Sequence, residues 1–197
     1  LMEGLSQLAQ NTRELQESVM RIRMLPISFA FSRFPRMVRD LGQTLGKKIH
    51  IELNGENTEL DKTVMEKIGD PLVHLVRNSV DHGIEPPDVR LAKGKPEEGH
   101  IMLNAYHQSG NVIIEITDDG KGLDREAITR KAIEKNIITP QEAGNLTDEQ
   151  VYDLIFQPGF STAQTVSDVS GRGVGMDVVK RNIQALNGVV EISSVPN

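Results

Sequence analysis

The chain has 197 residues, 38% of them hydrophobic, which is enough for one globular core with an appendage. Its formal net charge of −6 argues against a general nucleic-acid binder, and the absence of cysteine excludes disulfide scaffolds and thiolate metal sites. No apolar run is long enough to cross a bilayer and the amino terminus lacks a signal-peptide pattern, so we expect a cytoplasmic protein without membrane insertion. Because the chain starts abruptly at Leu1, we expect it to be a fragment of a longer protein.

The amino-terminal segment is expected to be a helix with a narrow apolar seam. Seven positions at alternating steps of four and three define this seam: Leu1, Leu5, Leu8, Thr12, Leu15, Val19 and Ile22. The seam either packs on its own domain or pairs with other helices in a dimer, and the abrupt start of the helix favours the dimer. Pro26 interrupts the pattern, so we place a domain boundary between residues 1–25 and residues 26–197.

The remainder of the chain mixes helical and strand patterns. Two alternating segments flank the turn residues 108–111 and are typical of a hairpin. Strands joined by a hairpin and mixed with helices indicate an α+β two-layer sandwich rather than a doubly wound parallel sheet. We expect helices over 29–42 (ending between Gly42 and Gly46), 61–82, 125–136, 148–156 and 174–187, and strands over 49–53, 101–107, 112–117 and 189–195.

The helix expected over 61–82 carries one polar face. Pro71 should kink or restart this helix, with Asp70 as its cap. At 100° per residue, four later polar residues fall within an arc of about 100°, opposite an apolar side: His74, Asn78, Asp81 and His82. The neutral carbonyl oxygen of Asn78 suits a magnesium ion that also keeps water and phosphate oxygens, so we interpret Asn78 as a metal ligand rather than a solvated helix residue.

Two glycine-rich blocks follow this helix: DDGKG at 118–122 and GRGVGMD at 171–177. Asp118 ends a strand before two glycines, so it either accepts a hydrogen bond from an exocyclic amine at the edge of a pocket or belongs to an ordinary polar turn. The second block precedes an apolar helix, whose free N–H groups attract phosphate, and it can also serve as a hinge. The helix and the two blocks together predict a nucleotide site, although the P-loop and dinucleotide fingerprints are absent.

Other segments carry weaker expectations. Residues 156–170 are rich in Gly, Ser and Thr and lack periodicity, which predicts a mobile loop. His50, His100 and His107 lie in expected strands without a carboxylate partner at catalytic spacing, so we interpret them as structural.

Five blocks of this sequence resemble the catalytic core of the CheA-type chemotaxis histidine kinases. These blocks are MLPIS (24–28), HLVRNSVDHGIE (74–85), DDGKG (118–122), PGFST (158–162) and GRGVGMD (171–177). The resemblance covers residues 24–195 and places the chain in the ATPase superfamily that includes histidine kinases, gyrase, Hsp90 and MutL. It implies a two-layer sandwich of that ATPase type, which transfers the γ-phosphate of ATP to a protein histidine.

The same resemblance implies roles for individual residues. Asn78 would bind magnesium, His82 would approach the phosphates or the metal, Asp118 would read the adenine amine, and Lys131 is a weaker candidate for a phosphate contact. Gly173 and Gly175 would cradle phosphate beneath a lid spanning 156–175. The other residues implied at the nucleotide are Arg77, Gly120, Gly122, Ser161, Gly171, Val174 and Met176.

The position one helical turn before the Asn commonly carries the base in this superfamily. Here it is His74, whereas members that activate water use Glu, and the difference favours phosphoryl transfer to histidine over hydrolysis. His74 could instead orient the site, because phosphoryl transfer depends mostly on positioning and charge neutralisation.

The resemblance also implies partners outside this chain. The acceptor histidine would lie on a separate phosphotransfer domain, and contacts with the chemoreceptor and coupling protein would be made by further domains. Residues 1–24 would be the end of a dimerisation helix, so we expect a homodimer in the full protein. The chain stops before the family's final strands, so we expect little autophosphorylation by this segment alone.

Two alternatives remain. The first is an ATP-hydrolysing clamp of the gyrase or MutL type, which the identity of His74 and the acidic surface disfavour. The second is a non-catalytic dimerisation or scaffold fragment, for which the amino-terminal seam is the best support.

Overall fold

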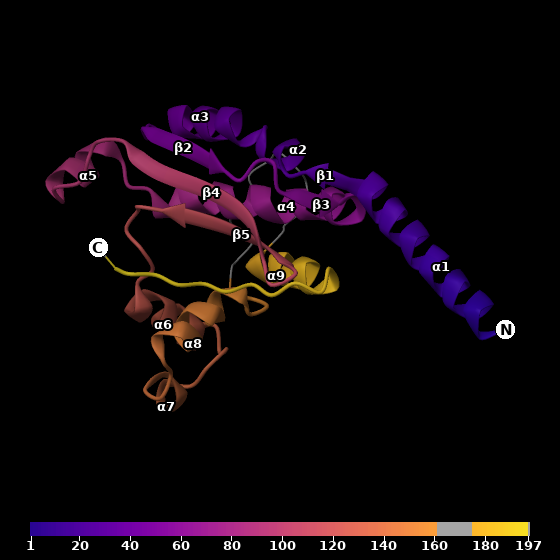
Figure 1. Ribbon diagram of the computed structural model, residues 1–197. Coiled ribbons are helices and arrows are strands. Elements are labelled where there is room, and N and C mark those ends of the chain that lie inside the picture. Colours follow the sequence, from indigo (N-terminus) through magenta and orange to yellow (C-terminus); the bar gives the residue numbers. More distant parts are fainter. Residues whose placement is uncertain (161–174, 197) are drawn as a thin grey trace.

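The computed structural model describes residues 1–160 and 175–196 (Figure 1). Its centre is a mixed sheet in the order β2-β4-β5. Strand β2 (Ile49–Asn54) is parallel to β4 (Gly99–Gln108), and β4 is antiparallel to β5 (Asn111–Asp118). Helices bury the apolar side chains of one face of this sheet, which confirms the predicted α+β two-layer class.

Strands β4 and β5 form the predicted hairpin. Along β4, Ile101, Leu103 and Ala105 are buried while the residues between them are half-buried, as expected for a sheet with one covered face. The register pairs Gln108 with Asn111, so the loop between the strands is the dipeptide 109–110. Both loop residues have positive φ angles, 51° and 80°, which is the geometry that joins two strands by the shortest turn.

Three helices form the layer against the sheet: α2 (Ser28–Phe31), α3 (Phe34–Leu45) and α4 (Lys62–Asn78). The single helix predicted before Gly46 is wrong, because a turn at residues 32–33 separates α2 from α3. This turn directs both Phe31 and Phe34 into the core, where their rings meet edge to face with centroids 6.3 Å apart. Helix α3 ends as predicted, since Gly46 follows it with a left-handed φ of 66°.

Helix α4 runs through Pro71 without restarting, so of the two predicted effects of this proline, a kink or a restart, the restart is wrong. Its cap is Asp61, whose carboxylate accepts a hydrogen bond from Thr63 N at 3.0 Å, rather than Asp70. Pro71 is buried in the same stretch as Ile68 and Leu72, so its packing against the core offsets the missing helical hydrogen bond. After Asn78 the chain continues as a π-helical turn, η1 (Ser79–Gly83), so only the first part of the predicted segment 61–82 is α-helical.

A small sheet that the sequence did not predict joins the amino-terminal helix to this core. Strand β1 (Met24–Pro26) pairs antiparallel with β3 (Glu59–Asp61), and the strands are too short for an alternating pattern to be visible. Helix α1 (Met2–Arg23) leads directly into β1 and stands clear of the rest of the molecule (Figure 1). The apolar seam of α1 is exposed, with Leu5, Leu8 and Leu15 at 63–66%, so it does not pack on the described part of its own chain.

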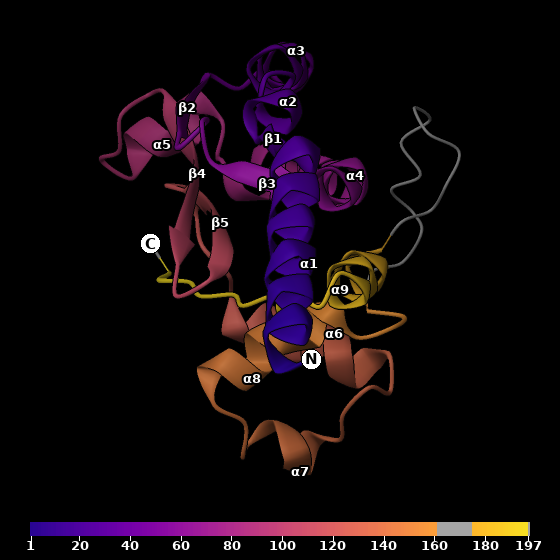
Figure 2. The ribbon, with the colours of Figure 1, turned by 45° about the vertical axis from the view of Figure 1, so that its right-hand side comes forward.

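The remaining helical elements are α5 (Pro87–Ala92), which comes before β4, and, after the hairpin, α6 (Arg125–Glu134), α7 (Pro140–Ala143), α8 (Asp148–Asp153), the short 3-10 turn η2 (Leu154–Phe156) and α9 (Met176–Ala185). Helices α6 to α8 lie on the opposite side of the molecule from α3 (Figure 2). Helices α6 and α8, with Phe160 from the segment after η2, share a small core that includes Ile128 and Val151. The sequence predicted α6, α8 and α9 but missed the short helices α5 and α7.

The strand predicted over 189–195 is wrong. Residues 188–196 form no ladder with any described strand. The alternation of apolar and polar residues was not sufficient to predict a strand, because a strand also needs a neighbouring strand to pair with. The segment is held by side chains instead: Ile192 packs on the α6–α8 core, and Ser194 Oγ accepts a hydrogen bond from Leu123 N at 2.8 Å. No helix in the described ranges is both long and apolar enough to cross a membrane.

Candidate functional site

The polar residues predicted on one helix face divide between two kinds of backbone. His74, Arg77 and Asn78 lie on the last turn and a half of α4, whereas Asp81 and His82 lie in the wider π-helical turn η1. A π turn has more residues per turn than an α-helix, so the rotation used to predict the arc does not apply beyond Asn78, and a common face for all four residues stays a prediction. Both side chains are exposed, and His82 Nε2 is 3.6 Å from Asp81 Oδ2.

A lysine from the loop before β2 supports the π turn. Lys47 Nζ donates hydrogen bonds to the backbone oxygens of Val80 and Asp81 at 2.9 and 2.7 Å. Burial lowers the pKa of Lys47, and the nearby charge of Asp81 only partly opposes this effect. π-helical turns inside α-helices recur at functional sites, and here the turn follows directly after Asn78.

Asn78 contacts the first turn of α9. Its Nδ2 donates to the Sδ atom of Met176 at 3.0 Å, and Met176 is buried. The sulfur can only accept here, so the contact assigns the amide nitrogen to Met176 and leaves the carbonyl oxygen for another partner. The structure therefore brings together two predicted site residues that are 98 positions apart in the sequence.

The DDGKG loop lies against the end of η1. Asp118 Oδ1 accepts a hydrogen bond from Gly120 N at 3.0 Å, and Gly83 O accepts one from Lys121 N at 3.0 Å. A Cβ atom at Gly120 would collide with the carbonyl of Gly83, so this approach requires glycine at position 120. Asp118 and the segment that follows Asn78 thus meet, as the sequence predicted, and the carboxylate of Asp118 is exposed.

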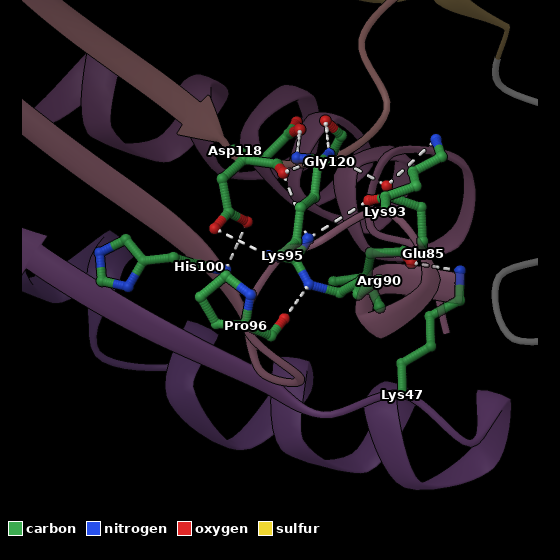
Figure 3. Close-up of polar contacts among 11 residues, drawn as sticks. Lys47, Glu85, Arg90, Lys93, Lys95, Pro96, His100, Asp118 and Gly120 are labelled. Atoms are coloured by element: carbon green, nitrogen blue, oxygen red, sulfur yellow. Dashed lines mark hydrogen bonds and ion pairs between the residues drawn. The ribbon is translucent and has the colours of Figure 1, made fainter. Parts of the chain in front are cut away.

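Next to this loop lies a network of charged side chains that sequence reasoning missed (Figure 3). Arg90 of α5 is 0% exposed and makes ion pairs with Glu85 at 3.2 Å and with Asp119 at 3.0 Å. Lys95 Nζ lies 3.0 Å from Glu85 and donates to Gly120 O at 3.0 Å. Buried charges are paired in native proteins, but nothing in the sequence distinguishes these residues from the solvated charges around them.

The buried carboxylate of this network remains ionised. Burial alone raises the pKa of Glu85, but hydrogen bonds and positive charge from Lys95 and Lys93 outweigh it and leave the pKa below its usual value. The network therefore contributes fixed charges beside the DDGKG loop.

The remaining predicted residues have other surroundings or lie outside the described residues. Lys131 of α6 places its Nζ 4.8 Å from the centroid of the Phe160 ring, a cation–π contact. Gly122 adopts a φ of 72° where the loop leaves the site, and Gly175 precedes α9. Four predicted residues, and most of the predicted lid and mobile loop, fall within residues 161–174, outside the described ranges: Ser161, Gly171, Gly173 and Val174.

One prediction about the strand histidines is wrong. His100 has a carboxylate partner, since its Nε2 is 3.1 Å from Glu52 Oε2 on the neighbouring strand. A hydrogen bond from Asn54, together with that from His100, lowers the pKa of Glu52. Strand register brings these residues together across 48 positions, a separation that sequence spacing does not reveal.

The structure also shifts the pKa of His74, on the helix that carries Asn78. Burial lowers the pKa of His74 and the positive charge of Arg77 lowers it further, so the imidazole is neutral at pH 7. An unfolded chain binds this proton at a pH near 6.5, before the folded protein does. Stability is therefore expected to fall as the pH drops from about 6.5 through the lower folded pKa.

Urea unfolding of the His74→Gln variant at pH 7.5 and 5.5 tests this expectation. The variant should lose less stability on acidification than the wild type, whereas His107→Gln, which replaces an exposed histidine at the end of β4, should match the wild type. Equal losses for wild type and His74→Gln would contradict the shift.

Comparison with known proteins defines the class of this fold. Residues 67–197 match the family described as histidine kinase-, DNA gyrase B- and HSP90-like ATPase, and the chain belongs to this family. The predicted ATPase-type sandwich and the resemblance that suggested it are therefore confirmed.

Individual relatives narrow the class. The chain is 58% identical to the chemotaxis protein CheA of Salmonella typhimurium, 52% identical to that of Bacillus subtilis, and 53% identical to the sensor histidine kinase CheAY of Helicobacter pylori, each time over 98% of its length. It spans 28%, 29% and 24%, respectively, of these relatives.

Proposed function

We propose that this chain is the ATP-binding catalytic core of a chemotaxis histidine kinase, which transfers the γ-phosphate of ATP to a histidine on a separate phosphotransfer domain. The observation that carries the proposal is the junction of the DDGKG loop with the end of the Asn78 helix. There Asp118 has one carboxylate oxygen bonded to Gly120 N, and the side chain is exposed to a ligand. Membership of the ATPase family and 58% identity to a CheA protein support it.

Asn78 is proposed as the protein ligand of Mg²⁺. Its amide nitrogen is occupied by Met176, so the carbonyl oxygen, the kind of atom that Mg²⁺ prefers, is the group left to bind. The described residues contain no group of three or more His, Asp or Glu side chains that could hold a metal alone. A single protein oxygen fits a Mg²⁺ ion that takes its other ligands from phosphate and water, and such an ion would neutralise phosphate charge.

His82 was predicted to approach either the metal or the phosphates. Imidazole is a poor ligand for Mg²⁺, whereas a ring N–H can donate to a phosphate oxygen. The exposed position of His82 beside Asp81 suits such a contact. We therefore place His82 at the phosphates, where Lys131 and Arg77 would add further positive charge.

Asp118 is proposed to bind the exocyclic amine of adenine. The exposed carboxylate can accept such a hydrogen bond, and Gly120 and Gly122 keep the neighbouring backbone close. Gly175 caps and Met176 begins α9, and Met176 contacts Asn78, so this helix N-terminus would lie near the phosphates. Ser161, Gly171, Gly173 and Val174 remain predicted contacts of the nucleotide.

His74 is proposed to act in phosphoryl transfer rather than in water activation. Its lowered pKa keeps the ring neutral at pH 7, so it can accept a proton from, or orient, the incoming imidazole. The hydrolysing clamp is the alternative enzyme, and no described contact favours it.

The partners proposed for the full protein follow the same family assignment. Residues 1–25 would be the end of a dimerisation helix and residues 26–197 the kinase core, and the exposed seam of α1 supports a homodimer. The phosphotransfer domain, the chemoreceptor and the coupling protein would bind outside this chain, in the cytoplasm. The exposed seam also suits a scaffold, so only an activity measurement separates the two functions.

The test is ATP binding and phosphotransfer by the full protein. Calorimetry with a non-hydrolysable ATP analogue and Mg²⁺ should show binding that weakens about tenfold or more in Asp118→Asn, because a hydrogen bond to a charged acceptor is lost. Asp153→Asn makes the same chemical change on an exposed residue of α8 and should bind as the wild type does. Phosphate release without an acceptor domain would favour the clamp, and no binding by the intact protein would leave the scaffold.

A further inference from the structure

The two consecutive aspartates of the DDGKG loop are in different situations. Asp119 is bonded at four atoms: its Oδ1 accepts from His100 N at 2.7 Å, its Oδ2 pairs with Arg90 at 3.0 Å, its N donates to His100 O at 3.2 Å, and its O accepts from Arg90 at 3.2 Å. Asp118 accepts only the hydrogen bond from Gly120 N among the described residues. Both carboxylate oxygens of Asp119 are thus bonded within the protein, whereas only one carboxylate oxygen of Asp118 has a partner among the described residues.

Arg90 is the group that makes this difference. Its side chain is 1% exposed and bonds in three directions: to Asp119, to Glu85 Oε1 at 3.2 Å, and through Nε to Pro96 O at 2.7 Å. These contacts tie the DDGKG loop to α5 and to the segment before β4 (Figure 3). A planar guanidinium can bond in all these directions at once, whereas a lysine ammonium on a flexible stem cannot reproduce the geometry.

Lys95 holds the next peptide of the loop. Its Nζ donates to the oxygens of Asp119 and Gly120 at 3.3 and 3.0 Å and pairs with Glu85. The loop is therefore fixed on its buried side by Arg90 and Lys95 and on its other side by Gly83. With residues 119 and 120 fixed, the direction in which Asp118 projects is also fixed.

We infer that Arg90 is a positioning residue for adenine recognition, which holds Asp119 so that Asp118 presents its carboxylate to the exocyclic amine. The inference rests on the proposed function, because it assumes that Asp118 binds adenine. It predicts that a variant without the Arg90 guanidinium prefers ATP less strongly over a nucleotide that lacks the 6-amino group. A loss of folded protein alone would not change this preference.

The test compares two nucleotides in the full protein. One is ATP, and the other is purine riboside triphosphate, which carries hydrogen in place of the 6-amino group. Their ratio of dissociation constants measures the contribution of the amine, and in the wild type it should be about 10 to 100. Partial unfolding lowers the apparent affinity for both nucleotides by the same factor, so it leaves the ratio unchanged.

Arg90→Lys keeps the charge and should reduce the ratio to about 1–3. Phe31→Leu is the matched control, because it weakens the core on α2 without touching the loop and should keep the wild-type ratio. If Arg90→Lys does not fold, Asp119→Asn repeats the test, since the amide oxygen can still accept from His100 N while the charge paired with Arg90 is lost.

The outcomes separate the inference from the proposed function. A wild-type protein that binds neither nucleotide overturns the nucleotide site itself. A wild-type ratio near 1 overturns the role of Asp118, and with it the inference. A high wild-type ratio that persists in Arg90→Lys or Asp119→Asn overturns the inference alone and leaves the proposed function standing.

Discussion

Replacing Arg90 with alanine is expected to lower the free energy of unfolding by about 3–5 kcal/mol, the range seen when one partner of a buried ion pair is removed. The change would leave Glu85 buried with one cation fewer and Asp119 without its ion-pair partner. It would also open a cavity, because the Arg90 side chain is fully enclosed. Urea unfolding followed by circular dichroism at pH 7 measures the loss.

Arg36→Ala is the matched control for this change. Arg36 pairs with Asp40 at 3.9 Å across one turn of α3, and its side chain is 88% exposed, so its replacement should cost less than about 0.5 kcal/mol. Similar losses in the two variants would show that the Arg90 network contributes no more than a surface pair.

Replacing Asn78 with alanine is expected to reduce phosphotransfer by about 100-fold or more. Mutation of a residue that only hydrogen-bonds to a metal ligand typically lowers metal affinity or activity by about 10- to 100-fold, and loss of the ligand itself should cost at least as much. Alanine has no oxygen for Mg²⁺ and no amide to bond Met176. Transfer of labelled phosphate from ATP to the phosphotransfer domain, measured across a Mg²⁺ titration, reports the effect. The loss should shrink as Mg²⁺ rises if the residue acts through the metal.

Two further variants identify what Asn78 contributes. Asn145→Ala removes an exposed amide near α7 and should leave phosphotransfer unchanged. Asn78→Asp keeps an oxygen for Mg²⁺ but loses the donor to Met176, so it should retain more activity than Asn78→Ala at high Mg²⁺. Full activity in Asn78→Ala would remove Asn78 from the site.

The parts of the fold that the sequence predicted are those set by local patterns. The β4–β5 hairpin follows from alternation around a Ser-Gly turn, and Gly46 ends α3 because only glycine takes that backbone conformation without strain. At the site, the glycines after the Asp118 carboxylate predicted a close approach of the backbone. The structure shows that Gly120 approaches the backbone of Gly83.

The parts that the sequence missed depend on contacts between distant segments. Arg90 and Asp119 are 29 positions apart, and their ion pair depends on how α5 lies against the end of β5 rather than on either residue alone. Helix α4 continues past Pro71, whose side chain is buried, and residues 189–195 pair with no described strand. Local propensity carries none of this information.

The base of α1 adjoins the far end of the helix that carries Asn78. Arg23, the last residue of α1, donates to Thr63 at 2.6 Å and pairs with Asp61 at 3.5 Å, and Asp61 caps α4. From there α4 extends about 25 Å to Asn78, given a rise of about 1.5 Å per residue. A movement of α1 would therefore act first on the amino-terminal end of α4, which is the end opposite Asn78.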